Sequence, residues 1–174
     1  MLKPLPIRKK LSGFSIIELM TAILVVVVLL MVAVPSFRTW LQNAQIRNAA
    51  HSITSGLQRA RAEAVARNTN ISFVLGADSS WTINVVNPAL EIESRAASEG
   101  SKDVAYTITP SGASTVTFNN LGIIVANADG SDALAQVDVA APGGTRDLRV
   151  TIGAGGNAKM CDPNLPSGSS PTAC

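Results

Sequence analysis

The sequence is poor in the residues that catalytic sites use. It contains one histidine and two cysteines in 174 residues, and aromatic residues account for only 4% of the chain. A Cys–His or Ser–His catalytic pair would have to use His51, which lies beside Ala50 in a helical stretch, where a surface or half-buried histidine is the simpler interpretation. No paired carboxylates stand out. We therefore predict that the protein is not an enzyme.

Sites for metals and cofactors have equally little support. Two cysteines and one distant histidine are too few ligands for a zinc site. The glycine-rich stretch 153–157 lacks the Lys-Ser/Thr pair of a phosphate-binding loop, and we interpret it as a tight hairpin. The sequence therefore predicts no metal and no cofactor.

The chain also lacks a large excess of either charge. It has 14 basic and 12 acidic residues, a formal net charge of +2, and four of the basic residues precede residue 11. Without these four, 10 basic residues face 12 acidic ones, which gives a net charge of −2. A globally basic nucleic-acid-binding protein is therefore not supported.

Five arginines nevertheless lie in one stretch that only Glu63 opposes. They are Arg38, Arg47, Arg59, Arg61 and Arg67. A solvated helix face is the ordinary explanation of such a run, and a basic stripe that faces a partner is the alternative.

What the chain does have is one long apolar run near its N-terminus. From Leu19 to Val34 the only polar side chain is Thr21, and one acid, Glu18, stands just before the run. About 20 helical residues at roughly 1.5 Å each span about 30 Å, the thickness of the hydrocarbon core of a membrane. A carboxylate at the start of such a helix is unfavourable unless a cation pairs with it.

The residues at the start of this run resemble a known processing signal. Residues 8–19 read RKKLSGFSIIEL: a short basic leader, then Gly13 and Phe14, and a glutamate at the fifth position counted from Phe14. This pattern resembles the class III signal of type IV pilins and of type II secretion pseudopilins. The resemblance implies cleavage between Gly13 and Phe14 by a prepilin peptidase and N-methylation of Phe14. It also implies an assembly role for Glu18, whose carboxylate pairs with the N-terminal amine of a neighbouring subunit.

Two other interpretations of the N-terminus explain less of it. A secretory signal has a shorter apolar region with its cleavage site afterwards, whereas Gly13 precedes the run. An ordinary membrane anchor does not explain Glu18.

A helix is predicted to continue beyond the apolar run. Apolar residues recur there at spacings of four and three: Ile46, Ala50, Ile53, Leu57, Ala60 and Ala64. Because this is one stripe of an amphipathic helix, we predict a helix from residue 14 to about residue 67, bent or loosened near Pro35. We expect its apolar half to project and its amphipathic half to pack on a globular domain.

The rest of the chain has the pattern of short strands separated by turns. We predict strands at 71–75, 81–86, 104–109, 115–118, 123–126, 137–140 and 148–152. Residues 89–103 stay undecided between strand and loop. One helix followed by a run of strands predicts an α+β, pilin-like fold with an antiparallel β-sheet on the helix.

The predicted organisation follows from these elements. A leader peptide occupies residues 1–13, and a transmembrane or filament-core helix half occupies residues 14–36. The globular domain is predicted at 37–174. Its parts are the amphipathic helix half 37–67, a sheet region 70–160 and a tail 161–174.

The two cysteines, Cys161 and Cys174, lie at the C-terminal end of the chain. The segment between them contains three prolines and little apolar material on which to fold. With the basic N-terminal end inside, the C-terminus lies in an oxidising compartment. We predict a disulfide that stabilises the tail by about 3 kcal/mol, with two free thiols as the alternative.

Three further segments resemble the GspH/FimT group of pilin-like proteins. They are residues 57–68, 118–122 and 156–163, which read LQRARAEAVARN, FNNLG and GNAKMCDP. With the final cysteine, they are similar to FimT- and FimU-type minor pilins. The resemblance implies a minor pilin for type IV pilus assembly or tip priming, with major and minor pilins as partners. It places the chain in the inner membrane, single-pass with a periplasmic C-terminus, and then in the pilus. The H-type pseudopilin of type II secretion is the alternative.

A DNA receptor for natural transformation is the competing function. FimT-type members implicated in DNA uptake carry Gly-Arg-x-Arg before the penultimate cysteine, where residues 156–159 of this chain read GNAK. One positive charge and both planar guanidinium groups are therefore lost. The candidate DNA contacts are Lys159, Arg149 and Arg146, and so small a patch predicts weak, salt-sensitive binding.

Overall fold

The structure is a computed structural model that describes residues 13–77, 79–99, 101–168 and 170–174. Most of the predicted leader therefore lies outside the described residues. The chain divides into two compact units, Met1–Phe37 and Arg38–Cys174.

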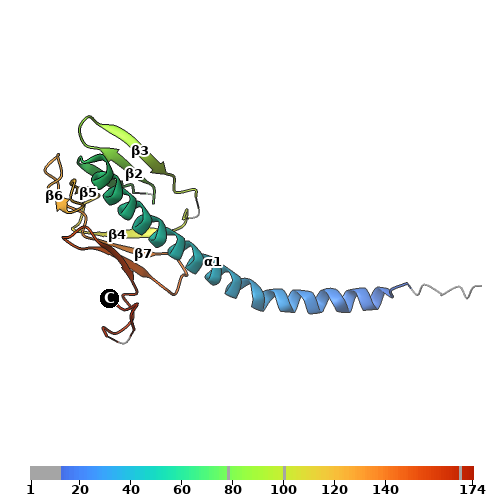
Figure 1. Cartoon of the computed structure of the whole chain (residues 1–174). Helices are drawn as coiled ribbons and strands as arrows, with labels where there is room; N and C mark the ends of the chain where they lie inside the picture. Colours follow the sequence, from blue (N-terminus) through green and yellow to red (C-terminus); the bar gives the residue numbers. More distant parts are fainter. Residues whose placement is uncertain (1–12, 78, 100, 169) are drawn as a thin grey trace, which may run out of the picture. The chain divides into compact units, whose positions relative to one another are not determined.

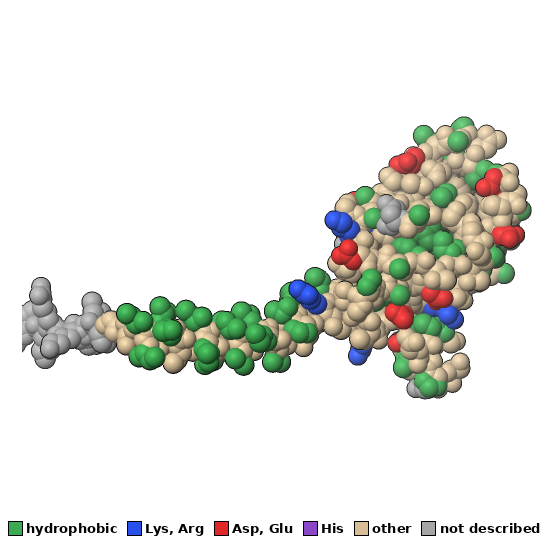
Figure 2. Space-filling view, turned by 180° about the vertical axis from the view of Figure 1, so that it is seen from behind, with side chains coloured by type: hydrophobic (Ala, Val, Ile, Leu, Met, Phe, Trp, Pro, Cys, Tyr) green, Lys and Arg blue, Asp and Glu red, His purple; other side chains and the backbone are tan. Residues whose placement is uncertain are grey.

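One long helix, α1 (Ile16–Arg67), contains 52 residues and continues across Pro35. The large apolar side chains from Ile16 to Val34 are exposed, and Figure 2 shows one side of this stretch. By length and composition α1 is suited to cross a membrane, with an 18-residue window of mean hydropathy 2.9. A helix that is apolar on all sides needs lipid or other apolar helices around it, so this part of α1 fits membrane anchoring.

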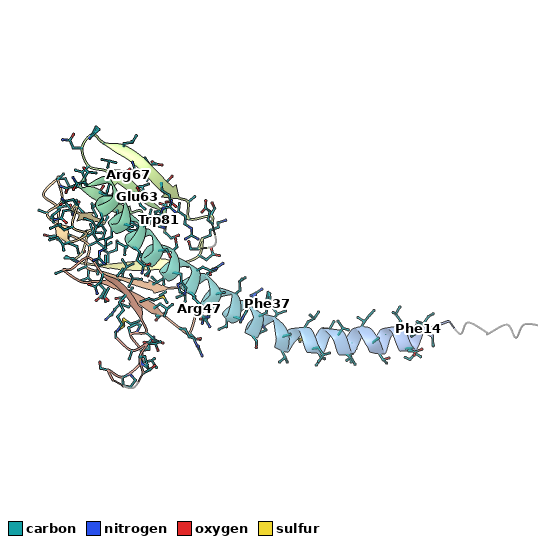
Figure 3. All side chains as sticks on the ribbon, viewed as in Figure 1. Phe14, Phe37, Arg47, Glu63, Arg67 and Trp81 are labelled. Carbon is teal, nitrogen blue, oxygen red and sulfur yellow. A yellow bond between two sulfur atoms is a disulfide. The ribbon has the colours of Figure 1, made fainter. Side chains whose placement is uncertain are left out.

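The part of α1 within the second unit is amphipathic, as predicted. Its buried residues are Ile46, Ala49, Ala50, Ile53, Gly56, Leu57, Ala60 and Ala64, which include every residue of the predicted stripe. Close packing requires glycine at position 56, because a Cβ there would lie 2.7 Å from Cε2 of Phe73 and 3.1 Å from the Trp81 ring. The Trp81 indole (Figure 3) donates a hydrogen bond of 2.8 Å from Nε1 to Ser52 Oγ. This bond fixes α1 against the strand that contains Trp81.

The helix ends at Arg67 because Asn68 adopts a left-handed conformation with a φ of 52°. The amide of Asn68 donates to the Val65 carbonyl at 3.3 Å, and the amide of Thr69 donates to the Ala64 carbonyl at 3.2 Å. These two bonds form a Schellman motif, and asparagine tolerates the left-handed region better than most residues. The predicted helix end near residue 67 is confirmed.

In the described part of the chain, nine strands follow α1 and form two antiparallel sheets (Figure 1). They are β1 (Ile71–Leu75), β2 (Trp81–Val85), β3 (Leu90–Arg95), β4 (Ala105–Thr109), β5 (Thr115–Phe118), β6 (Ile124–Val125), β7 (Gln136–Ala140), β8 (Leu148–Ile152) and β9 (Ala158–Cys161). Sheet A has the strand order β3-β2-β1-β5-β6, and sheet B has the order β4-β7-β8-β9.

The α+β prediction is confirmed, and the structure adds two strands and a second sheet to it. Strand β3 falls in the segment left undecided, and β9 follows the predicted hairpin and extends the sheet region to Cys161. The buried stripe from Ile46 to Ala64 spans about 27 Å of helix, whereas strands of five residues span only about 17 Å. The stripe is therefore longer than any one of these strands, and residues of both sheets share its core cluster.

Both sheets contribute to one core against α1. Sheet A provides Ile71, Phe73, Ile83 and Val116, and sheet B provides Val137, Val139 and Val150, all of them fully buried. The alternation of buried and partly buried residues along β1, β2 and β7 places one face of each sheet in this core.

Candidate functional site

The described part of the predicted processing motif, residues 13–19, lies at the start of α1. Gly13 and Phe14 precede the helix, and the Phe14 side chain is 85% exposed. Glu18 lies in the first helical turn, where the helix dipole favours a negative charge. Its carboxylate forms no ion pair with any described residue, so a cation from outside this part of the chain has access to it.

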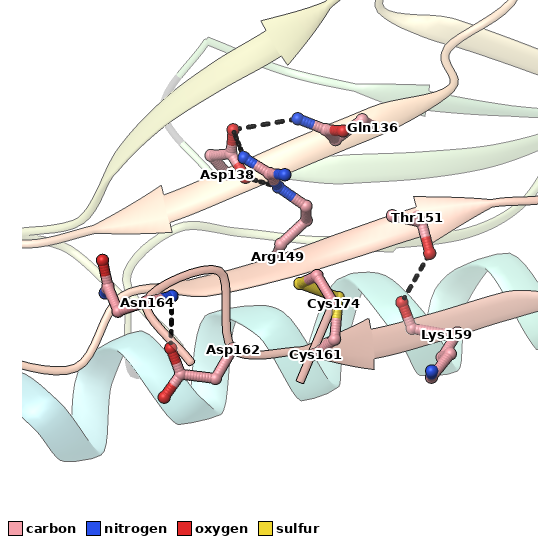
Figure 4. Close-up of polar contacts among 9 residues, drawn as sticks. All are labelled: Gln136, Asp138, Arg149, Thr151, Lys159, Cys161, Asp162, Asn164 and Cys174. Atoms are coloured by element: carbon pink, nitrogen blue, oxygen red, sulfur yellow. Dashed lines mark hydrogen bonds and ion pairs between the residues drawn. A yellow bond between two sulfur atoms is a disulfide. The ribbon is translucent and has the colours of Figure 1, made fainter. Parts of the chain in front are cut away.

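The two cysteines form the predicted disulfide. Cys161, the last residue of β9, is bonded to Cys174, and their Cα atoms lie 5.1 Å apart. Asp162 N donates to Thr172 O at 2.7 Å, and Cys174 N donates to Asp162 O at 3.3 Å. The disulfide, drawn in Figure 4, and these backbone bonds together fix the tail to the edge strand β9 of sheet B.

The three candidate DNA contacts do not form one patch. Val150 of β8 is buried in the core, so Arg149 lies on the outer face of sheet B, because side chains alternate along a strand. Lys159 is the register partner of Thr151 and therefore lies on the same outer face. Arg146 precedes β8 and lines a hollow beside α1 instead.

An acid on the neighbouring strand engages Arg149. Arg149 donates from Nε to Asp138 Oδ1 at 2.6 Å and from Nη2 to Oδ2 at 3.1 Å, and Gln136 donates to the same carboxylate at 3.0 Å (Figure 4). The hydrogen bonds to Asp138, with its negative charge, raise the pKa of Arg149 against the opposing effect of burial. Because Asp138 neutralises this guanidinium, Arg149 is a poor candidate for a phosphate contact.

The arginines of α1 do not form a continuous basic stripe. Arg59 pairs with Glu93 of β3 and Arg67 pairs with Glu63, each at 2.6 Å. Figure 3 labels Arg67 and Glu63, which are one helical turn apart. Exposed pairs of this kind contribute little stability, and they favour the solvated helix face as the interpretation of Arg59 and Arg67.

The three segments that resemble the GspH/FimT group meet in space. Arg61 of α1 donates a hydrogen bond of 2.9 Å from Nε to the Gly122 carbonyl. Gly156, in the turn between β8 and β9, lies so close that a Cβ there would be 2.2 Å from the same carbonyl oxygen and 3.3 Å from Phe118. We call Arg61, Phe118, Gly122 and Gly156 the glycine junction. Its close contacts give these residues a packing role that joins α1 to both sheets.

One group of polar residues was missed by the sequence analysis. A hollow of about 330 Å³, which we call the basic hollow, is lined among others by Asn43, Arg47, His51, Arg146, Met160 and Asp162. Asn43, Arg47 and His51 are spaced by four, so they lie on one face of α1. This spacing could have been recognised in the sequence. The position of Arg146 beside them could not be predicted from the sequence, because it depends on a contact between α1 and a loop about 100 residues further along the chain. No group of three or more described His, Cys, Asp or Glu residues is arranged to hold a metal ion.

These features define a pilin-like protein: a long N-terminal helix, apolar on all sides near its start, whose later turns pack on antiparallel sheets. Residues 49–156 match the family model described as type II transport protein GspH. Because this match covers more than half of the chain, the protein belongs to the GspH family.

Two solved structures resemble the chain, both crystal structures of the type IV minor pilin FimU from Pseudomonas aeruginosa strain PAO1. The P21 form matches with a TM-score of 0.52 and 18% identity, over 74% of this chain and 94% of FimU. The P65 form matches with a TM-score of 0.48 and 19% identity, over 74% of this chain and 98% of FimU. At this identity the first match shows a shared fold. No curated relative matches the sequence.

Proposed function

We propose that this protein is a minor pilin of a type IV pilus. In this proposal a prepilin peptidase cleaves the chain between Gly13 and Phe14, and the mature protein then enters the filament from the inner membrane. The observation that carries the proposal is the exposed apolar part of α1 with Glu18 in its first turn. Membership of the GspH family and the fold shared with FimU support a pilin-like subunit. In this role the chain contributes to pilus assembly or tip priming with other major and minor pilins.

Glu18 has a physical role in this proposal. Cleavage after Gly13 creates an α-amino group on Phe14, the methylated residue in related proteins. When apolar helices pack together, a carboxylate between them is stable only if a cation pairs with it. The amine of a neighbouring subunit supplies that cation. Because a broken pair leaves a buried charge, the pair selects the axial positions at which a subunit joins the filament.

We expect Glu18→Ala to impair entry into the filament while membrane insertion and cleavage continue. Removing the acid makes the segment more apolar, so insertion does not suffer, whereas the partner for a neighbour's amine is lost. Pilus counts and co-purification with other pilins measure the effect. Thr21→Ala is the matched control, one turn further along, and it should assemble normally. Normal piliation by Glu18→Ala would exclude this role for Glu18.

The H-type pseudopilin of type II secretion is a second candidate, which the name of the matching family model favours. Both functions use the same insertion and helix packing, so a deletion strain distinguishes them better than the isolated protein does. Loss of surface pili supports the pilus subunit. Loss of type II substrate release with normal pili supports the pseudopilin.

For DNA uptake we expect only weak binding, with a Kd above about 100 µM for duplex DNA at about 150 mM salt. Arg149 is neutralised by Asp138, and Lys159 of β9 is the one cation among residues 156–159. At this salt concentration exposed charges are screened beyond about 8 Å. A gel-shift titration measures the affinity, and the double variant Asn157→Arg with Lys159→Arg should bind more tightly. Low-micromolar binding that Lys159→Ala removes would instead make DNA uptake the leading function.

A further inference from the structure

The basic hollow contains two guanidinium groups and an imidazole that the described fold does not use. Arg47 and His51 reach it from α1, where Figure 3 labels Arg47, and Arg146 reaches it from the loop between β7 and β8. Neither arginine forms an ion pair with a described residue. Asp162 is the one acid among the described lining residues, so positive charge predominates in the hollow.

Contacts between the helix and the loop fix the backbone beside the two arginines. Asn43 donates from Nδ2 to Thr145 Oγ1 at 3.2 Å, and Thr145 N donates to Asn43 Oδ1 at 2.9 Å. This pair of hydrogen bonds fixes the residue before Arg146 to the helix that carries Arg47. The loop lies so close to α1 that a Cβ at Gly144 would be 2.6 Å from Ile46 Cδ1. A ligand therefore meets a site whose backbone is already organised.

The remaining walls are fixed as well. Met160 belongs to β9 and Leu148 to β8, and both pack against the hydrophobic core. Asp162 follows the disulfide-bonded Cys161, and its backbone is bonded to Thr172 across the tail. The hollow thus has an apolar floor, two arginines and an imidazole on its walls, and a single acid on the side of the tail.

We propose that the basic hollow binds the carboxylate of an Asp or Glu side chain presented by a neighbouring protein subunit. A carboxylate accepts up to four hydrogen bonds, and guanidinium groups match its planar geometry. One acidic side chain on a flexible stem suits a hollow of about 330 Å³ with an apolar floor. The choice of a subunit as the source rests on the proposed function in a filament.

DNA suits the hollow less well. Its backbone brings a row of phosphates, and Asp162 repels a second negative charge beside the first. Proteins that bind single strands also offer aromatic side chains on which bases stack. His51 supplies the one aromatic ring among the described lining residues.

The test uses the mature protein in detergent micelles and a blocked peptide of sequence Gly-Ser-Glu-Ser-Gly. Because His51 is the only histidine of the chain, its imidazole gives a unique NMR signal within the hollow. We expect a saturable shift of this signal, at about millimolar peptide, and no shift with the matching glutamine peptide. Arg47→Gln and Arg146→Gln should each weaken binding about tenfold, because each removes a charged hydrogen-bond donor.

Lys159→Gln is the matched control, since it removes the same charge from the outer face of sheet B, and it should change the affinity less than about twofold. Equal shifts with both peptides, no shift at all, or binding that both arginine variants retain would overturn the proposal. Tighter binding of a duplex DNA that depends on the same two arginines would also overturn it and assign the hollow to nucleic acid. The peptide titration involves no filament, so a negative titration leaves the Glu18 assembly test unaffected. A negative assembly test likewise leaves the peptide titration unaffected.

Discussion

Gly156→Ala is expected to lower the free energy of unfolding of the second unit by about 3 kcal/mol or more. Gly156 has a φ of 78°, where an L-residue is disfavoured by about 1–2 kcal/mol. The new methyl group would also lie 2.2 Å from the carbonyl oxygen of Gly122. That oxygen accepts the hydrogen bond from Arg61 at 2.9 Å, so it has little freedom to move away. Urea denaturation of a fragment that starts at Arg38 measures the loss.

Gly130→Ala separates the cost of the left-handed backbone conformation from the cost of the steric clash. Gly130 has nearly the same φ, 75°, but a Cβ there meets no described atom within 4 Å. We expect this control to lose only the backbone contribution, about 1–2 kcal/mol. Equal losses in the two variants would show that the glycine junction relaxes around an added methyl group, and would remove its role in joining α1 to both sheets.

Gly13→Val is expected to abolish removal of the leader in cells that carry the prepilin peptidase. In the proposed reaction Gly13 precedes the cleaved bond, and a branched side chain there obstructs the approach of the peptidase. A Cβ at Gly13 meets no described atom within 4 Å, so the substitution leaves the fold unchanged. The intact mass of membrane-derived protein should therefore include residues 1–13 in the variant and exclude them in the wild type.

Gly13→Ala serves as the control, because it adds the smallest side chain, and we expect at least partial cleavage. A Gly13→Val chain that begins at Phe14 would contradict the assignment of the site. So would a wild-type chain that begins at any other residue. Either result would leave the fold and the family membership as they stand and change only the proposed processing.

Local patterns in the sequence predicted much of the fold. The buried stripe of α1 was visible because helical residues three and four apart share a face, and Ala50, Ile53 and Leu57 keep that spacing. Strands β1, β5 and β8 were visible because β-branched and apolar residues alternate or cluster between turn residues. Strand β9 was missed, because Ala158, Lys159 and Met160 have no strong strand preference and become a strand only by pairing with β8.

The sequence by itself therefore determined the membrane-compatible helix, the order of helix and strands, and the family. These features depend on neighbours within about one or two turns along the chain. The tertiary structure alone decided which cations meet partners that are distant in the sequence. Arg149 meets Asp138 only because β7 and β8 pair, and Arg61 meets Gly122 across 61 residues of sequence. The basic hollow exists only because Asn43 binds Thr145 across 102 residues and brings Arg146 to the helix of Arg47. Contacts between such distant residues leave no periodic pattern in the chain, so they are determined by the packing of the core.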